Sequence, residues 1–123
     1  MSRLPDKLDL ALTTRLREVV SGQPATESEL RSLADQAGGW KRAVGAQLRA
    51  AERRLARLNG DPTSPLAEMA TEIRRVETLA GELEEARALV AGLERRTREL
   101  RTEYLKHHAG SAGPFGPPSS ASG

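Results

Sequence analysis

Two long runs of regularly spaced apolar residues, separated by one short turn, constrain what this chain can fold into. In both runs an apolar side chain returns every three or four positions, which keeps it on one face of an α-helix and makes a seam for a partner helix. The first series is Leu30, Leu33, Ala37, Trp40, Val44, Leu48, Ala51, Leu55 and Leu58. The second is Leu66, Met69, Ile73, Val76, Leu79, Leu83, Ala86, Val90, Leu93, Thr97, Leu100 and Tyr104. The sequence therefore predicts an all-α protein built on a long antiparallel, coiled-coil-like helical hairpin.

The first arm of the hairpin has a clear start. Thr26 followed by Glu29 has the form of a capping box, in which a hydroxyl and a carboxylate three residues apart satisfy free amides at a helix N-terminus. It stands directly before the first apolar series, and so we expect a helix over about 27–58. Gly38-Gly39 weakens this helix, because a glycine costs about 1 kcal/mol relative to alanine in a helix interior. The seam keeps its phase through the pair, which favours a continuous helix.

The turn between the two series is equally well marked. Asn59-Gly60 predicts that the first arm ends through a left-handed residue, and Ser64-Pro65 predicts a cap followed by a first-position proline. The second helix is then expected over about 65–108, and the hairpin as a whole over 26–108.

Shorter segments flank the hairpin. Residues 1–25 are expected to contain a short helix over 5–21, ended by Gly22, and a linker. This helix can fold onto the part of the second arm near Leu93, Leu100 and Leu105. Residues 109–123 consist almost entirely of Gly, Ser, Pro and Ala. Such a segment buries too little apolar surface to order itself, which predicts a disordered tail.

No residue pattern in the chain indicates catalysis. Apolar residues make up 37% of the sequence, and the seam uses most of the large ones. There is no phosphate-binding glycine loop or nucleophile motif. His107-His108 has no further ligand at zinc spacing, and no cysteine is present. We therefore expect a non-enzymatic protein without cofactor or metal. The absence of a signal-like or membrane-spanning segment predicts a cytoplasmic location, or a nuclear one in a eukaryote.

A basic run on the first arm admits three interpretations. Folding the hairpin about its turn sets Arg49 and Arg53 beside Glu72 and Glu77, where opposite charges flanking the seam fix the pairing of the arms. The same arginines, together with Arg54 and Arg57, can instead contact the phosphate backbone of a nucleic acid, or an acidic protein. The net charge of +2 does not decide between these interpretations.

Residues off the seam predict a partner. A hairpin alone leaves Leu89 and Leu105 uncovered, and exposed apolar stripes mark contact surfaces. Trp40 lies mid-seam near four glycines, whose missing side chains allow close approach of a further helix; they are Gly38, Gly39, Gly45 and Gly81. The leading hypothesis is an adaptor or regulatory subunit that forms a homodimer or a complex with another helical protein. The residues expected to bind the partner are Trp40, Leu89, Leu93, Leu100, Leu105, Arg49, Arg53 and Arg57. The alternative function is a hairpin that binds nucleic acid or the transcription machinery through its arginine-rich face.

Overall fold

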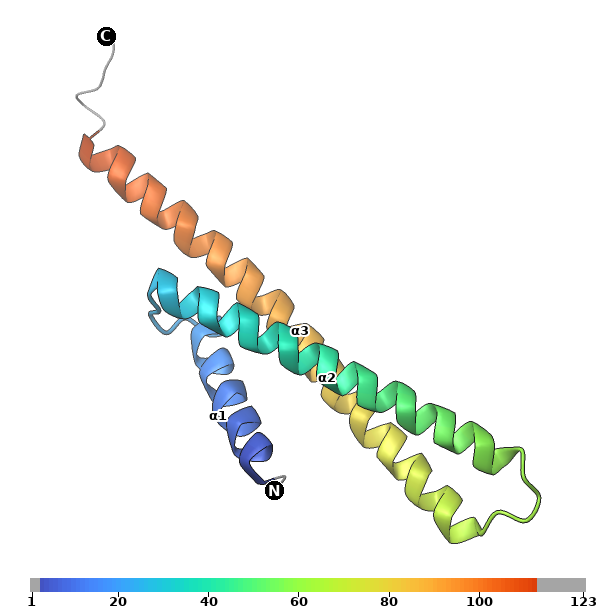
Figure 1. Ribbon diagram of the computed structural model, residues 1–123. Helices are drawn as coiled ribbons and strands as arrows, with labels where there is room; N and C mark the ends of the chain where they lie inside the picture. Colours follow the sequence, from blue (N-terminus) through green and yellow to red (C-terminus); the bar gives the residue numbers. More distant parts are fainter. Residues whose placement is uncertain (1–2, 113–123) are drawn as a thin grey trace.

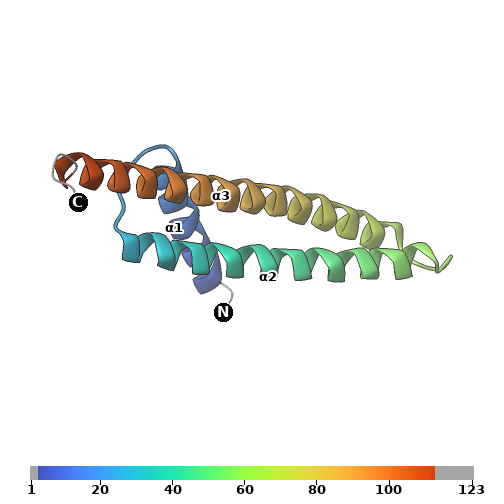
Figure 2. The ribbon, with the colours of Figure 1, turned by 90° about the horizontal axis from the view of Figure 1, so that it is seen from above.

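Three α-helices make up the computed structural model: α1 (Arg3–Val20), α2 (Glu27–Asn59) and α3 (Leu66–Ala112). The structure describes the backbone of residues 3–112 and the side chains of residues 10–108. The two long helices, α2 and α3, run antiparallel along each other, and α1 lies across them in the half away from their connecting turn (Figures 1 and 2). The predicted all-α hairpin preceded by a short helix is confirmed.

The end of α1 is fixed by its backbone. Gly22 has a φ of +119°, its N–H donates to the Val19 carbonyl at 3.1 Å, and the Gln23 N–H donates to the Glu18 carbonyl at 2.9 Å. These two bonds form a Schellman motif. The motif needs a residue in the left-handed backbone conformation, which glycine adopts without steric cost. The expected role of Gly22 as the helix terminator is confirmed.

The start of α2 uses half of the predicted capping box. Thr26 Oγ1 accepts the Glu29 N–H at 3.0 Å, as a helix cap requires. The carboxylate of Glu29 binds Arg15 of α1, so the residue that ends the box also joins two helices. From there α2 continues without a break through Gly38-Gly39, as expected.

The turn after α2 differs from the prediction. Gly60 has a φ of −85° and a ψ of −4°, in the right-handed region, and so the expected left-handed residue is wrong. Its N–H still donates to the Ala56 carbonyl at 3.0 Å and completes the last turn of the helix. The reversal is made instead by Asp61, whose Oδ1 accepts the N–H of Thr63 at 3.0 Å and its hydroxyl at 2.7 Å. These two bonds lower the pKa of Asp61.

The second long helix runs from Leu66 to Ala112. Its first backbone bond runs from the Met69 N–H to the Pro65 carbonyl at 3.2 Å. The helix continues past residue 108, after which the tail was expected to begin, because the first proline after Pro65 is Pro114. The rest of the predicted tail lies outside the described residues.

The core lies almost entirely in the half of the hairpin that α1 covers, which we call the three-helix end. Its buried apolar residues are Leu12, Leu16, Val19, Leu30, Leu33, Ala37, Trp40, Val44, Leu79, Leu83, Ala86, Leu89 and Leu93. In the remaining two-helix half, the arm (residues 48–76), Ala51 is the one described apolar residue in the core. Ile73, expected in the seam, is 42% exposed because two helices alone shield only a narrow stripe.

None of the helices in the described range is long and apolar enough to cross a membrane.

Candidate interaction surfaces

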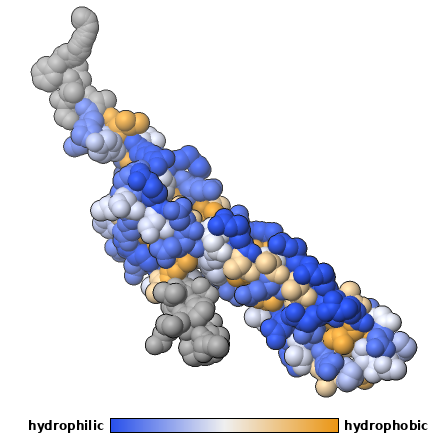
Figure 3. All heavy atoms as spheres, viewed as in Figure 1, coloured by the Kyte–Doolittle hydropathy of each residue, from blue (hydrophilic) through white to orange (hydrophobic). Residues whose placement is uncertain are grey.

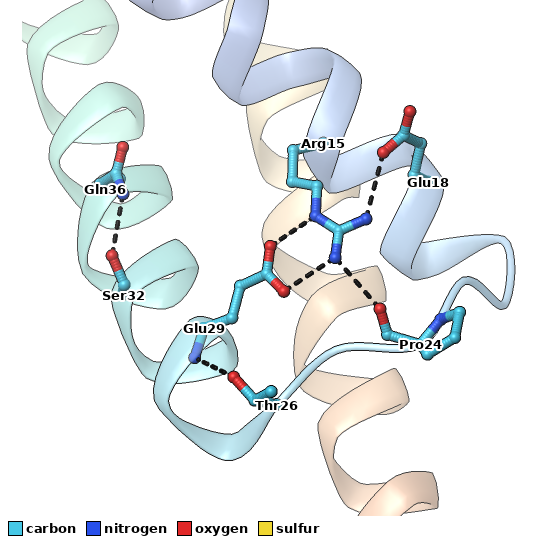
Figure 4. Close-up of polar contacts among 7 residues, drawn as sticks. All are labelled: Arg15, Glu18, Pro24, Thr26, Glu29, Ser32 and Gln36. Atoms are coloured by element: carbon cyan, nitrogen blue, oxygen red, sulfur yellow. Dashed lines mark hydrogen bonds and ion pairs between the residues drawn. The ribbon is translucent and has the colours of Figure 1, made fainter.

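A salt-bridged arginine holds α1 against the start of α2 (Figure 4). Arg15 approaches the Glu29 carboxylate with Nε at 2.5 Å and Nη2 at 2.8 Å. Its guanidinium also reaches the Pro24 carbonyl at 3.0 Å and the Glu18 carboxylate at 3.1 Å. The hydrogen bonds from Arg15 lower the pKa of Glu29, and those to Glu29 and Glu18 raise the pKa of Arg15. One side chain thus ties together α1, the linker and α2.

A second set of contacts holds α1 against α3. Arg17 forms an ion pair with Glu85, and Arg96 donates to the Gly22 carbonyl at 3.3 Å. Between them lies Gly92, where an added Cβ would stand 3.0 Å from Cγ1 of Val20. The missing side chain therefore lets α1 approach α3 closely. Gly92 was not among the glycines expected to allow a close approach, although a glycine beside Leu93 in the middle of a long helix is a signal for one.

Three of the residues expected to bind a partner lie inside the chain's own core. Leu89, Leu93 and Trp40 are 9%, 2% and 7% exposed. The indole Nε1 of Trp40 donates to Glu82 of α3 at 3.1 Å, so its polar edge is satisfied within the hairpin. The expectation that Leu89 stays uncovered is wrong, because α1 supplies the third layer that a bare hairpin lacks.

The glycines near Trp40 are not covered by another helix of the described chain. Gly81 is exposed, and a Cβ added to it or to Gly39 would meet nothing within 4 Å. At Gly38 and Gly45 the nearest atoms belong to arginine side chains of α2 itself, at 3.4 and 3.5 Å. Within the chain itself, a helix approaches a glycine closely at Gly92, where Val20 of α1 packs.

The other expected apolar residues, Leu100 and Leu105, remain at the surface. With Tyr104 they line a groove of about 710 Å³ at the open end of the hairpin, the end groove. Tyr104 and Leu105 are 64% and 65% exposed, and so the expected cover of Leu105 by the short helix is wrong. The ring of Tyr104 packs edge-on against His108 with centroids 4.0 Å apart. Figure 3 shows apolar side chains at the surface of this part of the molecule.

The end groove continues into a second depression between α2 and α3. This smaller groove, of about 320 Å³, shares Leu30 and Arg101 with the end groove. Arg101 also binds Glu27 at 3.0 Å, a pair that marks the level at which α2 begins. C-terminal to Arg101, no described residue of α2 lies opposite α3, and Tyr104 and Leu105 are exposed there.

The three arginines expected to bind a partner lie together on the arm, although they form none of the ion pairs predicted for them. Arg49, Arg53 and Arg57 are exposed, and within the described part of the chain none has an ionic partner. In this half of the hairpin, the ion pair that joins α2 to α3 uses Arg54, whose Nε lies 3.4 Å from Glu72. The expected pairing of Arg49 and Arg53 with Glu72 and Glu77 is therefore wrong: helix periodicity turns Arg54, and not its neighbours, toward α3.

No protein-family model, curated protein or solved structure matches this chain. Among the described residues no group of three or more side chains is arranged to hold a metal ion. Two surfaces of the chain differ clearly in character. The end groove is concave and largely apolar, whereas the outer face of α2 on the arm is convex and carries unpaired arginines.

Proposed function

We propose that this chain is a non-enzymatic protein–protein interaction module that acts through helix packing at its end groove, as an adaptor or a regulatory subunit. The groove receives a helix, either from a second copy of the chain or from another helical protein. The observation that carries the proposal is the exposure of Tyr104 and Leu105, next to half-buried Leu100, on a helix that extends past its partner.

The chemistry of the groove supports a helical partner. An amphipathic helix binds by laying apolar side chains at positions i, i+3, i+4 and i+7 into a hydrophobic groove. Leu93, Thr97, Leu100 and Tyr104 have this spacing on α3 and continue the seam. At Leu93 the seam is filled by the chain itself, and at Tyr104 it is open. A partner helix entering at the open end would extend the packing that α2 provides further down.

The charged rim supports binding in a defined position. Arg101 and Glu27 form an exposed ion pair at the edge of the groove, and Arg98 lines the smaller groove beside it. Exposed pairs of this kind contribute little to affinity, and they help to select the orientation of a partner.

Sedimentation equilibrium over micromolar concentrations tests the proposal with a second copy as the partner. We expect a monomer–dimer equilibrium that Leu105→Gln weakens by about tenfold or more, because each buried leucine contributes about 1.5–3 kcal/mol. Leu66→Gln is the matched control: Leu66 is 81% exposed at the opposite end of the same helix, outside the groove. It should leave the association constant unchanged.

Two results contradict this form of the proposal. A strictly monomeric chain over the whole concentration range rules out the second copy and leaves only a helix of another protein. Equal weakening by the two leucine substitutions shows that association does not use the end groove.

A further inference from the structure

The outer face of α2 carries a row of arginines, three on the arm and one at the three-helix end, that the fold does not use. Arg42, Arg49, Arg53 and Arg57 are all exposed, and within the described residues none forms an ion pair; we call these four the basic ridge. At 100° per residue they lie within about 80° of one another around the helix, on the side opposite the seam. The ridge is about 22 Å long at 1.5 Å per residue.

No acidic side chain interrupts the ridge. The other position of the same face between its ends is Ala46, and Ala50 and Ala56 lie just to either side of it. Glu52 is the one acidic residue between Lys41 and Asn59, and it lies about 90° around the helix from the centre of the ridge. The exposed face of α3 differs from the ridge, because there Arg74 lies on the same face as the acidic residues Glu77 and Glu84. In Figure 3, strongly hydrophilic residues follow the arm that α2 and α3 form.

We propose that the basic ridge binds the phosphate backbone of double-helical nucleic acid, independently of base sequence. Guanidinium groups form paired, charge-assisted hydrogen bonds with phosphate oxygens, and a duplex offers a negative charge about every 1.7 Å along its axis. The ridge is a convex single helix, a shape that the major groove, about 12 Å wide, admits.

The composition of the ridge selects this ligand among the polyanions. A single strand is usually held by aromatic side chains that stack on its bases, and the ridge has none. Arginine can read guanine, but reading a varied base sequence also needs side chains such as asparagine, glutamine or glutamate, whereas the ridge offers only arginine and alanine. An acidic protein helix would have to match the positions of four arginines, while a duplex supplies phosphates along the whole ridge. The basic ridge is separate from the end groove, so this inference goes beyond the proposed function.

The salt dependence of binding measures the number of phosphate contacts. Four contacts predict a slope of about −3.6 for the logarithm of the binding constant against the logarithm of salt concentration. A fourfold rise in salt then weakens binding by about 150-fold. Removing two contacts with Arg49→Gln/Arg53→Gln should reduce the slope to about −1.8, and the loss to about 12-fold.

Fluorescence anisotropy with the full chain provides the test. The probes are two labelled 20-base-pair DNA duplexes of unrelated sequence, one of their single strands, and polyglutamate. We expect both duplexes to bind with dissociation constants of about 10⁻⁴–10⁻⁶ M near physiological salt, equal to within about threefold, and more tightly than the single strand.

The matched control is Arg74→Gln/Arg95→Gln on α3. Both arginines are exposed and have no ion pair in the described part of the chain, so the control changes the net charge by the same amount. It should keep the wild-type slope. The inference is overturned if the duplexes do not bind at low salt, if the control loses as much as the ridge variant, or if the single strand or polyglutamate binds as tightly as the duplexes. The test does not depend on dimerisation. The Leu105→Gln variant, which weakens the proposed dimer, leaves the ridge intact and should bind the duplexes with the wild-type slope.

Discussion

The three-helix end and the arm are built from the same two long helices with the same apolar spacing, yet they differ greatly in burial. Leu33 and Leu93 at the three-helix end are 5% and 2% exposed, whereas Ile73 on the arm is 42% exposed. The difference arises from α1, because a third helix closes the side of the seam that two helices leave open. An apolar repeat thus determines which residues face a partner helix, and the number of layers determines how deeply they are buried.

The largest effect is expected where the third layer meets the hairpin. Leu16→Ala removes a side chain of α1 that is fully buried, and should cost about 2–5 kcal/mol in the free energy of unfolding. Leu55→Ala on the arm removes a half-buried side chain, and should cost about 1–2 kcal/mol. Urea denaturation of the two variants measures the difference. Equal losses would show that burial does not differ between the two regions.

Two glycines on α3 should respond to alanine with opposite signs. At Gly92 the added methyl group meets Val20 at 3.0 Å, and overpacking of this kind costs about 1–3 kcal/mol. At Gly81 the methyl group meets nothing within 4 Å, so the gain in helix propensity should stabilise the chain by about 1 kcal/mol. Thermal melts followed by circular dichroism compare the two. A higher melting temperature for Gly92→Ala would mean that α1 does not pack closely on α3.

The cap at the start of α2 should have a smaller effect. Thr26→Ala loses the hydrogen bond to the Glu29 amide, and should cost about 1 kcal/mol. Ser32→Ala is its control, because the Ser32 hydroxyl bonds only the exposed side chain of Gln36, and it should change stability by less than about 0.5 kcal/mol. Chemical denaturation distinguishes the two. A loss at Ser32 as large as that at Thr26 would contradict the assigned cap.

The smallest effect is expected from the ion pair between Arg15 and Glu29, and it should depend on pH. Because Arg15 lowers the pKa of Glu29 below its ordinary value of 4.5, the folded state favours the ionised carboxylate. The stabilisation is therefore present above about pH 4.5 and is lost as the pH falls through the lowered pKa. The melting temperature of Glu29→Gln should lie below that of the wild type at pH 7, and the gap should close toward pH 3.

Glu77→Gln on the arm supplies the comparison for this experiment. Glu77 is exposed and has no ion pair within the described residues, so its substitution should give no such gap at pH 7. A gap of constant size from pH 7 to pH 3 for Glu29→Gln would show that its carboxylate charge is not what stabilises the joint.

The helices and their antiparallel pairing were predictable from local sequence. The apolar period specifies a helix, and the short turn between the two series leaves little freedom in how the two long helices align. The cross-helix bond from Arg54 to Glu72 lies within about one helical turn of the level at which Arg49 and Arg53 were expected beside Glu72 and Glu77. Gly22 and Thr26 were also predictable, because each acts within its own few residues.

The position of α1 could not be predicted in the same way. A short helix with one apolar face can dock at many levels of a long hairpin, and its level here depends on Val20 meeting Gly92 and on Arg15 meeting Glu29. These contacts join residues far apart in the chain, which no periodic pattern connects. The misplaced expectation for Leu89 follows directly, because its burial depends on where α1 lies.

The ion pairs of the arm show a second limit. Arg49 and Arg53 were predicted to bind α3 because acidic residues of α3 lie at the same level of the hairpin. The rotation of α2 about its axis instead turns Arg54 toward α3. A rotation error of one residue, about 100°, is enough to turn an internal ion pair into an exposed surface. The basic ridge, which carries the inference about nucleic acid, follows from that rotation.

Amide hydrogen exchange on the free chain, kept dilute and without nucleic acid, tests the contrast between the two regions most directly. Opening of a region that buries little apolar surface costs less than opening of a packed core. We predict that amides of residues 48–58 and 69–76 exchange at least about tenfold faster than those of residues 33–44 and 83–93. Uniform protection along α2 and α3 would contradict the claim that α1 concentrates the stability of this chain at one end of its hairpin.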